Sequence, residues 1–222
     1  GFGSAAKYVA STVREIAAGA SVYDNKKSVT IVEIMGRHAG WLTAAGVLAR
    51  KFEGDNPVLI YLPETAFDIE KFISDVKGAL EKVPNLVVCL SEGIHDGNGT
   101  FICELASDVG VDNFGHKMLT GSGKYLENLV KEKVGVKVRS IELNVCQRCS
   151  SAMLSGTDQN EAVASGAYGV KCAIEGMTGK MIGFSRQPGK EYKIDYVAED
   201  VNLICNREKT VPLEWITGNG SD

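Results

Sequence analysis

The sequence lacks several features that would mark other classes of protein. No apolar run approaches the roughly 20 residues that a membrane-spanning helix requires. No basic stretch followed by an apolar segment opens the chain, so we expect no secretory signal. The three histidines, His38, His95 and His116, are scattered without the spacing of metal ligands, and we assign them no catalytic role. Internal repeats and low-complexity tracts are absent too, so we expect a globular protein of the cytoplasm without a membrane partner.

The sequence also has few prolines and little net charge. The 222 residues include only 5 prolines, with 25 glycines and 44% hydrophobic residues, which is typical of a soluble α/β protein. The net charge is −4 and the two signs are interleaved, which argues against nucleic acid as a partner. An anionic substrate would therefore need arginine and lysine side chains placed locally.

Paired cysteines are few. Of the six cysteines, only Cys146 and Cys149 form a C-x-x-C pair, and no second pair completes the spacing of a zinc ribbon. Cys89 and Cys205 fall inside apolar runs, which predicts buried thiols. We interpret the cysteines as reduced thiols, and a redox role for the C-x-x-C pair stays an alternative.

Short apolar runs alternate with helical patterns along the first 90 residues. The predicted strands cover residues 29–34, 58–62 and 86–90, and the predicted helices cover residues 42–52 and a segment capped by Asp68. Because the strands are continuously apolar, they predict a parallel sheet with helices on both faces. Ligands of such sheets bind at the C-terminal ends of the strands.

The rest of the chain continues the alternation of helices and strands. Ser4 is the predicted N-cap of the first helix, and Asp158 with Glu161 predicts a capping-box-like start of a later one. Further elements are expected as a helix over 124–133, a strand within 136–145, and strands over 180–184 and 192–197.

Two segments at the predicted strand ends carry candidate functional side chains. Met35-Gly36-Arg37 follows the first strand, and Ser91-Glu92-Gly93 follows the third. A turn that leads from a strand into a helix leaves backbone N–H groups available to an anion, and an arginine there can bind phosphate in bidentate fashion. The carboxylate of Glu92 would suit hydroxyl recognition beside such a pocket. The pattern alone also allows an ordinary turn with a solvated arginine.

The run from residue 32 to residue 45, Val-Glu-Ile-Met-Gly-Arg-His-Ala-Gly-Trp-Leu-Thr-Ala-Ala, closely resembles the M-G-R-x-x-G segment of phosphofructokinases. Further segments match the family pattern in order and spacing. These segments are Gly1-Phe2, Ser91-Glu92-Gly93, Phe114-Gly115-His116, Arg139, Glu142-Leu143-Asn144 and Gln147-Arg148. Together they cover nearly the whole chain. The residues after Gly40 and the Gln147-Arg148-Cys149 form are more similar to the pyrophosphate-dependent branch than to the ATP-dependent bacterial enzymes.

The resemblance implies an α/β parallel-sheet three-layer sandwich of the phosphofructokinase type. Residues 1–148 would form the fructose-6-phosphate-binding lobe, and residues 149–222 would cross back to complete a missing N-terminal donor lobe and end in a tail. We therefore expect apolar side chains meant for that lobe between residues 151 and 184. The candidates are Leu154, Val163, Tyr168, Val170, Ile174 and Ile182.

The resemblance also implies an activity and a set of roles. The family transfers a phosphoryl group to the 1-hydroxyl of fructose 6-phosphate in glycolysis, using Mg²⁺. Met35, Gly36 and Arg37 would lie along the sugar phosphate, and Arg37 would also stabilise the charge of the transferred phosphoryl group. Glu92 would accept hydrogen bonds from the sugar hydroxyls.

Two further arginines would bind the sugar phosphate on the same grounds. Arg148 would bind the 6-phosphate, and Arg139 would do so from a neighbouring subunit of a homo-oligomer, in which allosteric control is possible. Two departures from the family pattern affect this region, because Val145 stands where a histidine or tyrosine is common and Ser28 replaces an arginine.

Two segments of the family pattern do not occur in the chain. One is the Gly-Gly-Asp segment that binds the phosphoryl donor and Mg²⁺, and the other is the Thr-Ile-Asp-Asn-Asp segment that carries the catalytic base; both precede the position of Gly1 in the family. We therefore expect the acceptor-binding fragment of a pyrophosphate-dependent enzyme, inactive alone, with its Mg²⁺ ligands mainly in the missing part. The alternatives are an ATP-dependent enzyme and a non-catalytic sugar-phosphate-binding regulatory subunit.

Overall fold

The computed structural model describes residues 1–22, 26–105 and 121–218, so the Phe114-Gly115-His116 segment lies outside the described residues. The chain forms two compact units. We call residues 5–153 with 209–222 the sheet unit, and residues 1–4 with 154–208 the hairpin unit. The functional division at residue 148 stays a prediction. None of the helices in the described part of the chain combines the length and apolar character that crossing a membrane requires.

A parallel sheet of four strands forms the centre of the sheet unit, in the order β2-β3-β1-β4. The strands are β1 (Ser28–Ile34), β2 (Leu59–Tyr61), β3 (Asn85–Ser91) and β4 (Lys137–Glu142). Ile34 pairs with Ser91 and Glu33 pairs with Glu142, so β1, β3 and β4 end at the same level. All residues of β3 are buried, whereas β4 lies at the edge and is partly exposed. The predicted parallel sheet is confirmed.

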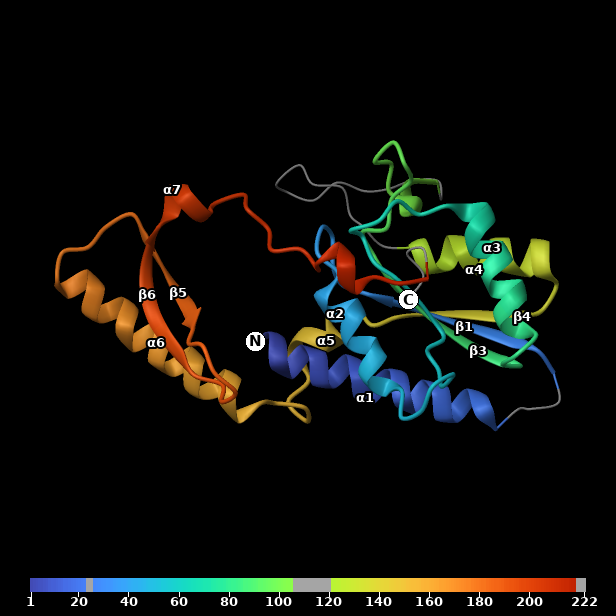
Figure 1. Ribbon diagram of the computed structural model, residues 1–222, viewed down its shortest axis with the longest axis horizontal. Coiled ribbons are helices and arrows are strands. Elements are labelled where there is room, and N and C mark those ends of the chain that lie inside the picture. The colour runs from blue at the N-terminus through green and yellow to red at the C-terminus, as the bar shows by residue number, and fades with distance from the viewer. Residues whose placement is uncertain (23–25, 106–120, 219–222) are drawn as a thin grey trace. The chain divides into compact units, whose positions relative to one another are not determined.

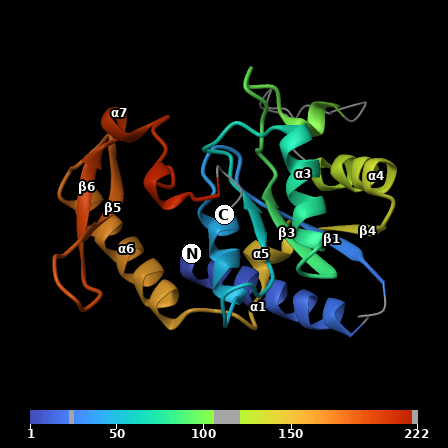
Figure 2. The same ribbon diagram turned by 45° about the vertical axis from the view of Figure 1, so that its right-hand side comes forward.

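Helices cover both faces of this sheet, which confirms the predicted three layers (Figure 1 and Figure 2). One face carries α3 (Ile69–Leu80) and α4 (Ser122–Val134), and the other carries α1 (Phe2–Ser21), α2 (Trp41–Ala44) and the 3₁₀ helix η1 (Ala45–Ala49). Asp68 caps α3 as predicted, because its side chain accepts a hydrogen bond from the Lys71 amide at 3.0 Å. The remaining short helices of this unit are η2 (Ile102–Leu105), α5 (Cys146–Cys149) and η3 (Leu213–Trp215).

The hairpin unit consists of one long helix, a two-stranded antiparallel sheet and a short helix. Its elements are α6 (Gly156–Ile174), β5 (Lys180–Arg186), β6 (Ile194–Asp200) and α7 (Val201–Ile204). Tyr196 links the elements, since its ring lies 6.1 Å from that of Tyr168 and 5.5 Å from that of Phe184. In this unit, one face of α6 therefore packs against the hairpin of β5 and β6.

The structure corrects the two predicted helix starts. Ser4 lies inside α1, and its Oγ donates to Asp158 Oδ2 at 2.6 Å instead of capping the helix. Ser155 caps α6, since its side chain accepts from the Asp158 amide. Burial raises the pKa of Asp158, but the hydrogen bonds from Ser4 and the charge of the N-terminal amino group together hold that pKa below its ordinary value. Both predictions failed because the side chains of Ser4 and Asp158, which are far apart in sequence, form a hydrogen bond with each other and do not cap the helices.

Candidate functional site

The turn after β1 is held by the segment that follows β3. The Gly36 amide donates to Glu92 Oε1 at 3.3 Å. The Gly36 carbonyl accepts hydrogen bonds from the Ser91 hydroxyl at 2.5 Å and from the Gly93 amide at 3.2 Å. The two segments that the sequence analysis selected are therefore joined directly, at the C-terminal ends of β1 and β3.

Glycine at position 93 is required by this contact. A Cβ atom on Gly93 would lie 1.8 Å from the carbonyl oxygen of Arg37, a separation at which the backbone must move. Only a residue without a side chain lets the two turns approach so closely. Gly93 therefore determines where Arg37 lies relative to Glu92.

Helix α5 brings Arg148 to the same edge of the sheet. Gln147 is only 2% exposed. Its Nε2 donates to the Asn144 carbonyl at 3.0 Å, and its Oε1 accepts a hydrogen bond from the Met35 amide at 3.4 Å. Gln147 thus connects α5 to the turn after β1. The sequence analysis used this residue only as part of a motif, because nothing in the local pattern reveals its partner.

Glu92 is a partly buried carboxylate between positive charges. Burial raises its pKa above the ordinary value, while the Gly36 amide and the charges of Arg37 and Arg148 act in the opposite direction. Both guanidinium groups therefore lie close enough to influence this carboxylate. The arrangement combines cations for an anionic group with an acceptor for hydroxyl groups.

Glu33, at the end of β1, is a second buried carboxylate. It is 3% exposed, and burial raises its pKa to about 7, although its Oε2 accepts a hydrogen bond from the Gly123 amide at 2.6 Å. The charges of Glu142 and Glu92 raise the pKa further. Together these three glutamates line a small hollow with Met35, next to the turn after β1.

These carboxylates do not fit a metal ion. Within residues 1–22, 26–105 and 121–218, no group of three or more His, Cys, Asp or Glu side chains is arranged to hold one. Burial keeps Glu33 partly protonated near neutral pH, which opposes its use as a ligand of Mg²⁺.

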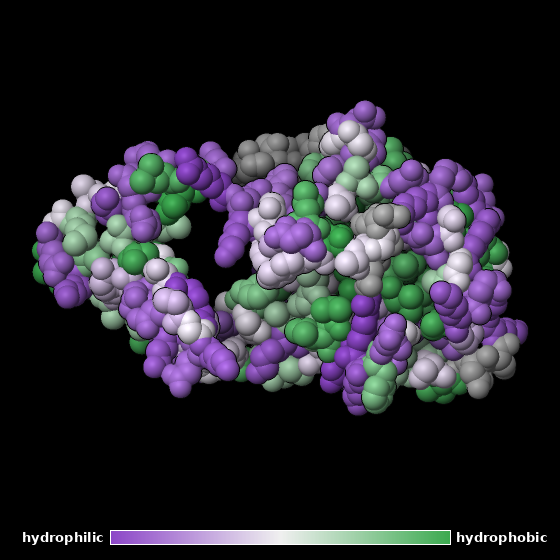
Figure 3. Space-filling model, in the orientation of Figure 1, coloured by the Kyte–Doolittle hydropathy of each residue, from purple (hydrophilic) through white to green (hydrophobic). Residues whose placement is uncertain are grey.

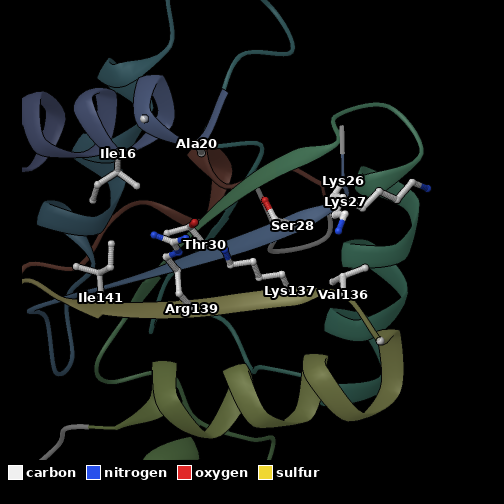
Figure 4. A pocket seen from close by; sticks show the side chains of 12 residues that line it. Ile16, Ala20, Lys26, Lys27, Ser28, Thr30, Val136, Lys137, Arg139 and Ile141 are labelled. Carbon is white, nitrogen blue, oxygen red and sulfur yellow. The ribbon is translucent and has the colours of Figure 1, made fainter. Parts of the chain in front are cut away.

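Arg139 lies away from the other candidate residues. It is in the middle of β4, where it pairs with Thr30, and it lines a cavity of about 640 Å³. Figure 4 shows the basic side chains of Lys26, Lys27, Lys137 and Arg139 around this cavity, with Ile16 of α1 opposite. The structure therefore brings together Met35, Gly36, Arg37, Glu92 and Arg148, but it does not bring Arg139 to them.

The sequence analysis missed Glu64, which follows β2 at the same edge. Its Oε1 accepts hydrogen bonds from the amides of Gly40 and Val211, both at 2.8 Å. It also lines a hollow of about 290 Å³ with Arg37 and His95. The available signal was its position, since a polar residue within a few positions of the end of a buried strand is also what identifies Glu92.

Comparisons with known proteins identify similar chains. The profile of the family described as Phosphofructokinase matches residues 1–173. The pyrophosphate–fructose 6-phosphate 1-phosphotransferase of Xanthomonas campestris pv. campestris is 38% identical over 221 residues, which make up 99% of this chain and 52% of that protein. The ATP-dependent 6-phosphofructokinase of Mycobacterium bovis is 31% identical over 165 residues, covering 70% of this chain and 46% of that protein.

A solved structure shows the same likeness. The crystal structure of the pyrophosphate-dependent phosphofructokinase from Marinobacter aquaeolei has a TM-score of 0.80 and 32% identity, covering 100% of this chain and 51% of that one. The chain spans about half the length of the curated relatives it matches.

Proposed function

Because the chain belongs to the phosphofructokinase family, we propose that it is the acceptor-binding part of an enzyme that transfers a phosphoryl group from pyrophosphate to the 1-hydroxyl of fructose 6-phosphate. The observation that carries the proposal is the meeting of Arg37, Glu92 and Arg148 at one edge of the parallel sheet. This edge is where the strands of such a sheet end and where its ligands bind.

The roles are those that the resemblance to the family implies, and the charges of the groups suit them. Arg148 binds the 6-phosphate, and the turn of Met35, Gly36 and Arg37 lies along the sugar phosphate. Arg37 also faces the transferred phosphoryl group, where a fixed positive charge stabilises the transition state. Glu92 accepts hydrogen bonds from the sugar hydroxyls, which its hydrogen bond to the Gly36 amide supports by fixing one of its oxygens.

The remaining parts of the reaction lie outside this chain. We place the catalytic base, the pyrophosphate site and the Mg²⁺ ligands in the part of the whole protein that corresponds to the half of the relatives this chain does not span. The position of Arg139 on an edge strand, beside a basic cavity and away from Arg37, supports a role toward the site of a neighbouring subunit. The reaction is a step of glycolysis, and we place it in the cytoplasm.

Isothermal titration of the chain with fructose 6-phosphate tests the acceptor site. We expect saturable binding, and we expect Arg148→Ala to weaken it by roughly 10- to 150-fold, the value of one charge-assisted contact. Arg207→Ala is the matched control, because this exposed arginine lies in the hairpin unit and should leave the affinity unchanged. The proposal would be contradicted if the folded wild-type chain did not bind fructose 6-phosphate. It would also be contradicted if Arg148→Ala and Arg207→Ala bound fructose 6-phosphate with the same affinity.

The donor is tested on the whole protein that contains this chain. We expect turnover of fructose 6-phosphate with pyrophosphate, in line with the relatives of that name at 38% identity. Activity with ATP alone would favour the ATP-dependent alternative, which the likeness to the Mycobacterium bovis enzyme keeps open. Binding without turnover with either donor would favour a regulatory subunit.

A further inference from the structure

Cys146 and Cys149 bracket the residues that connect α5 to the candidate site. Both cysteines are exposed, whereas Cys89, Cys103 and Cys172 are buried. Burial raises the pKa of the Cys89 thiol to about 12, which keeps that thiol protonated and unreactive. Among the described residues, the exposed thiols are therefore this pair and Cys205, which lies in the other unit.

The geometry of α5 suits a bond between the two sulfur atoms. Cys146 and Cys149 are the first and last residues of the helix, one turn apart. Residues three apart in an α-helix have Cα atoms about 5 Å apart, within the roughly 4.4–6.8 Å found across disulfides. The Cys149 sulfur lies 3.8 Å from the Cys146 carbonyl oxygen, so this side chain is already directed toward its partner residue.

Closing the bond would change the turn that carries Arg148. Cβ atoms three apart on a helix are about 5–6 Å apart, and a disulfide requires about 4 Å, so the turn must tighten. That turn contains the Gln147 side chain, bonded to the Met35 amide, and the Arg148 amide, bonded to the Val145 carbonyl at 2.9 Å. The Ser150 amide also donates to the Cys146 carbonyl at 3.2 Å, so the tightening would reach the chain after the helix.

We propose that Cys146 and Cys149 are a modification site, a dithiol that a small-molecule disulfide oxidises to an intramolecular disulfide. One cysteine thiolate attacks the small disulfide, forms a mixed disulfide and releases one small thiol. The second cysteine then displaces the other small thiol, so two protein thiols are oxidised while one small disulfide is reduced to two thiols. The closed form binds the sugar phosphate more weakly, a consequence that rests on the proposed function.

Mapping the thiols tests the modification itself. The chain is incubated with oxidised glutathione, the remaining thiols are alkylated, and the peptides are identified by mass. We expect one intramolecular disulfide between Cys146 and Cys149, absent from Cys146→Ser and from Cys149→Ser. Cys205→Ser is the matched control and should form the same disulfide as the wild type. Alkylation of both thiols, or glutathione retained on one of them without closure, would overturn the proposal.

Titration with fructose 6-phosphate tests the consequence. We expect the oxidised chain to bind about tenfold more weakly, with recovery on reduction by dithiothreitol, and we expect the double variant Cys146→Ser, Cys149→Ser to be insensitive to oxidation. Equal affinities of the mapped oxidised form and the reduced form would overturn the coupling. If the reduced chain does not bind at all, the proposed function fails, while the thiol mapping still decides whether the dithiol closes.

Discussion

The two units of this chain bury their apolar side chains to very different extents. In the sheet unit, both faces of the sheet lie against helices, and side chains such as Ile31, Phe72 and Leu126 are fully buried. In the described part of the hairpin unit, Cys172 is the one buried hydrophobic side chain. On the face drawn in Figure 3, apolar side chains interrupt the polar surface of the hairpin unit.

The difference follows from the number of layers. A sheet between two helical layers can bury both of its faces, whereas one helix on a two-stranded hairpin buries a single seam. Val163, Val170 and Ile174 of α6 are exposed, at 75%, 62% and 82%, as expected for side chains that another lobe would cover. Tyr168 and Ile182 are instead partly buried, because they lie in the seam between α6 and the hairpin. We expect the sheet unit to provide most of the stability.

Truncating a core side chain of the sheet unit should have the largest effect. Phe72 is fully buried, with its ring 5.5 Å from that of Tyr61 and 5.4 Å from that of Phe67. Phe72→Ala should lower the free energy of unfolding by about 3–5 kcal/mol, measured by urea unfolding. Phe184→Ala in the half-exposed hairpin is the matched comparison and should cost clearly less. Equal losses would show that the two units are equally well packed.

A methyl group at position 93 should have the next largest effect, concentrated at the candidate site. Because its Cβ would lie 1.8 Å from the Arg37 carbonyl oxygen, Gly93→Ala should cost about 3 kcal/mol and weaken binding of fructose 6-phosphate. Gly97→Ala is the control, since a Cβ there has no neighbour within 4 Å. Urea unfolding and calorimetry measure both effects. Wild-type affinity in Gly93→Ala would contradict a positioning role for this contact.

The buried carboxylate of Glu33 should make the stability of the sheet unit depend on pH. Its pKa is raised from 4.5 to about 7, so between these values the unfolded chain loses the proton while the folded chain keeps it. The contribution of Glu33 to the free energy of unfolding therefore falls as pH rises through this window and is constant above it. Glu33→Gln should remove a loss on the order of 3 kcal/mol between pH 4 and pH 8.

Urea unfolding of this variant and of the wild type at several pH values measures the difference. Glu199→Gln, on the exposed side of β6, is the matched control and should follow the wild type at every pH. A difference between Glu33→Gln and the wild type that does not change with pH would contradict the raised pKa.

Much of the sheet unit was predictable because its signals are local. Continuous apolar runs predicted the buried strands, and the order of strands and helices predicted a parallel sheet whose C-terminal edge carries Arg37 and Glu92. The prediction for Cys205 was wrong, since this thiol is exposed. Its apolar neighbours belong to the hairpin unit, which has too few layers to bury them. Cys89, in a similar run on β3, is buried as predicted.

Periodicity and turn chemistry act over a few residues, so local patterns in the sequence were enough to predict most of the elements, their order and the side chains available at the strand ends. Which of these side chains meet depends on contacts between distant segments. Two contacts join distant segments: Gly93 lies against Arg37, and the Met35 amide donates a hydrogen bond to Gln147. Arg139, in contrast, lies at a different cavity. Such pairings depend on how the sheet and its helices pack, and no local pattern records them.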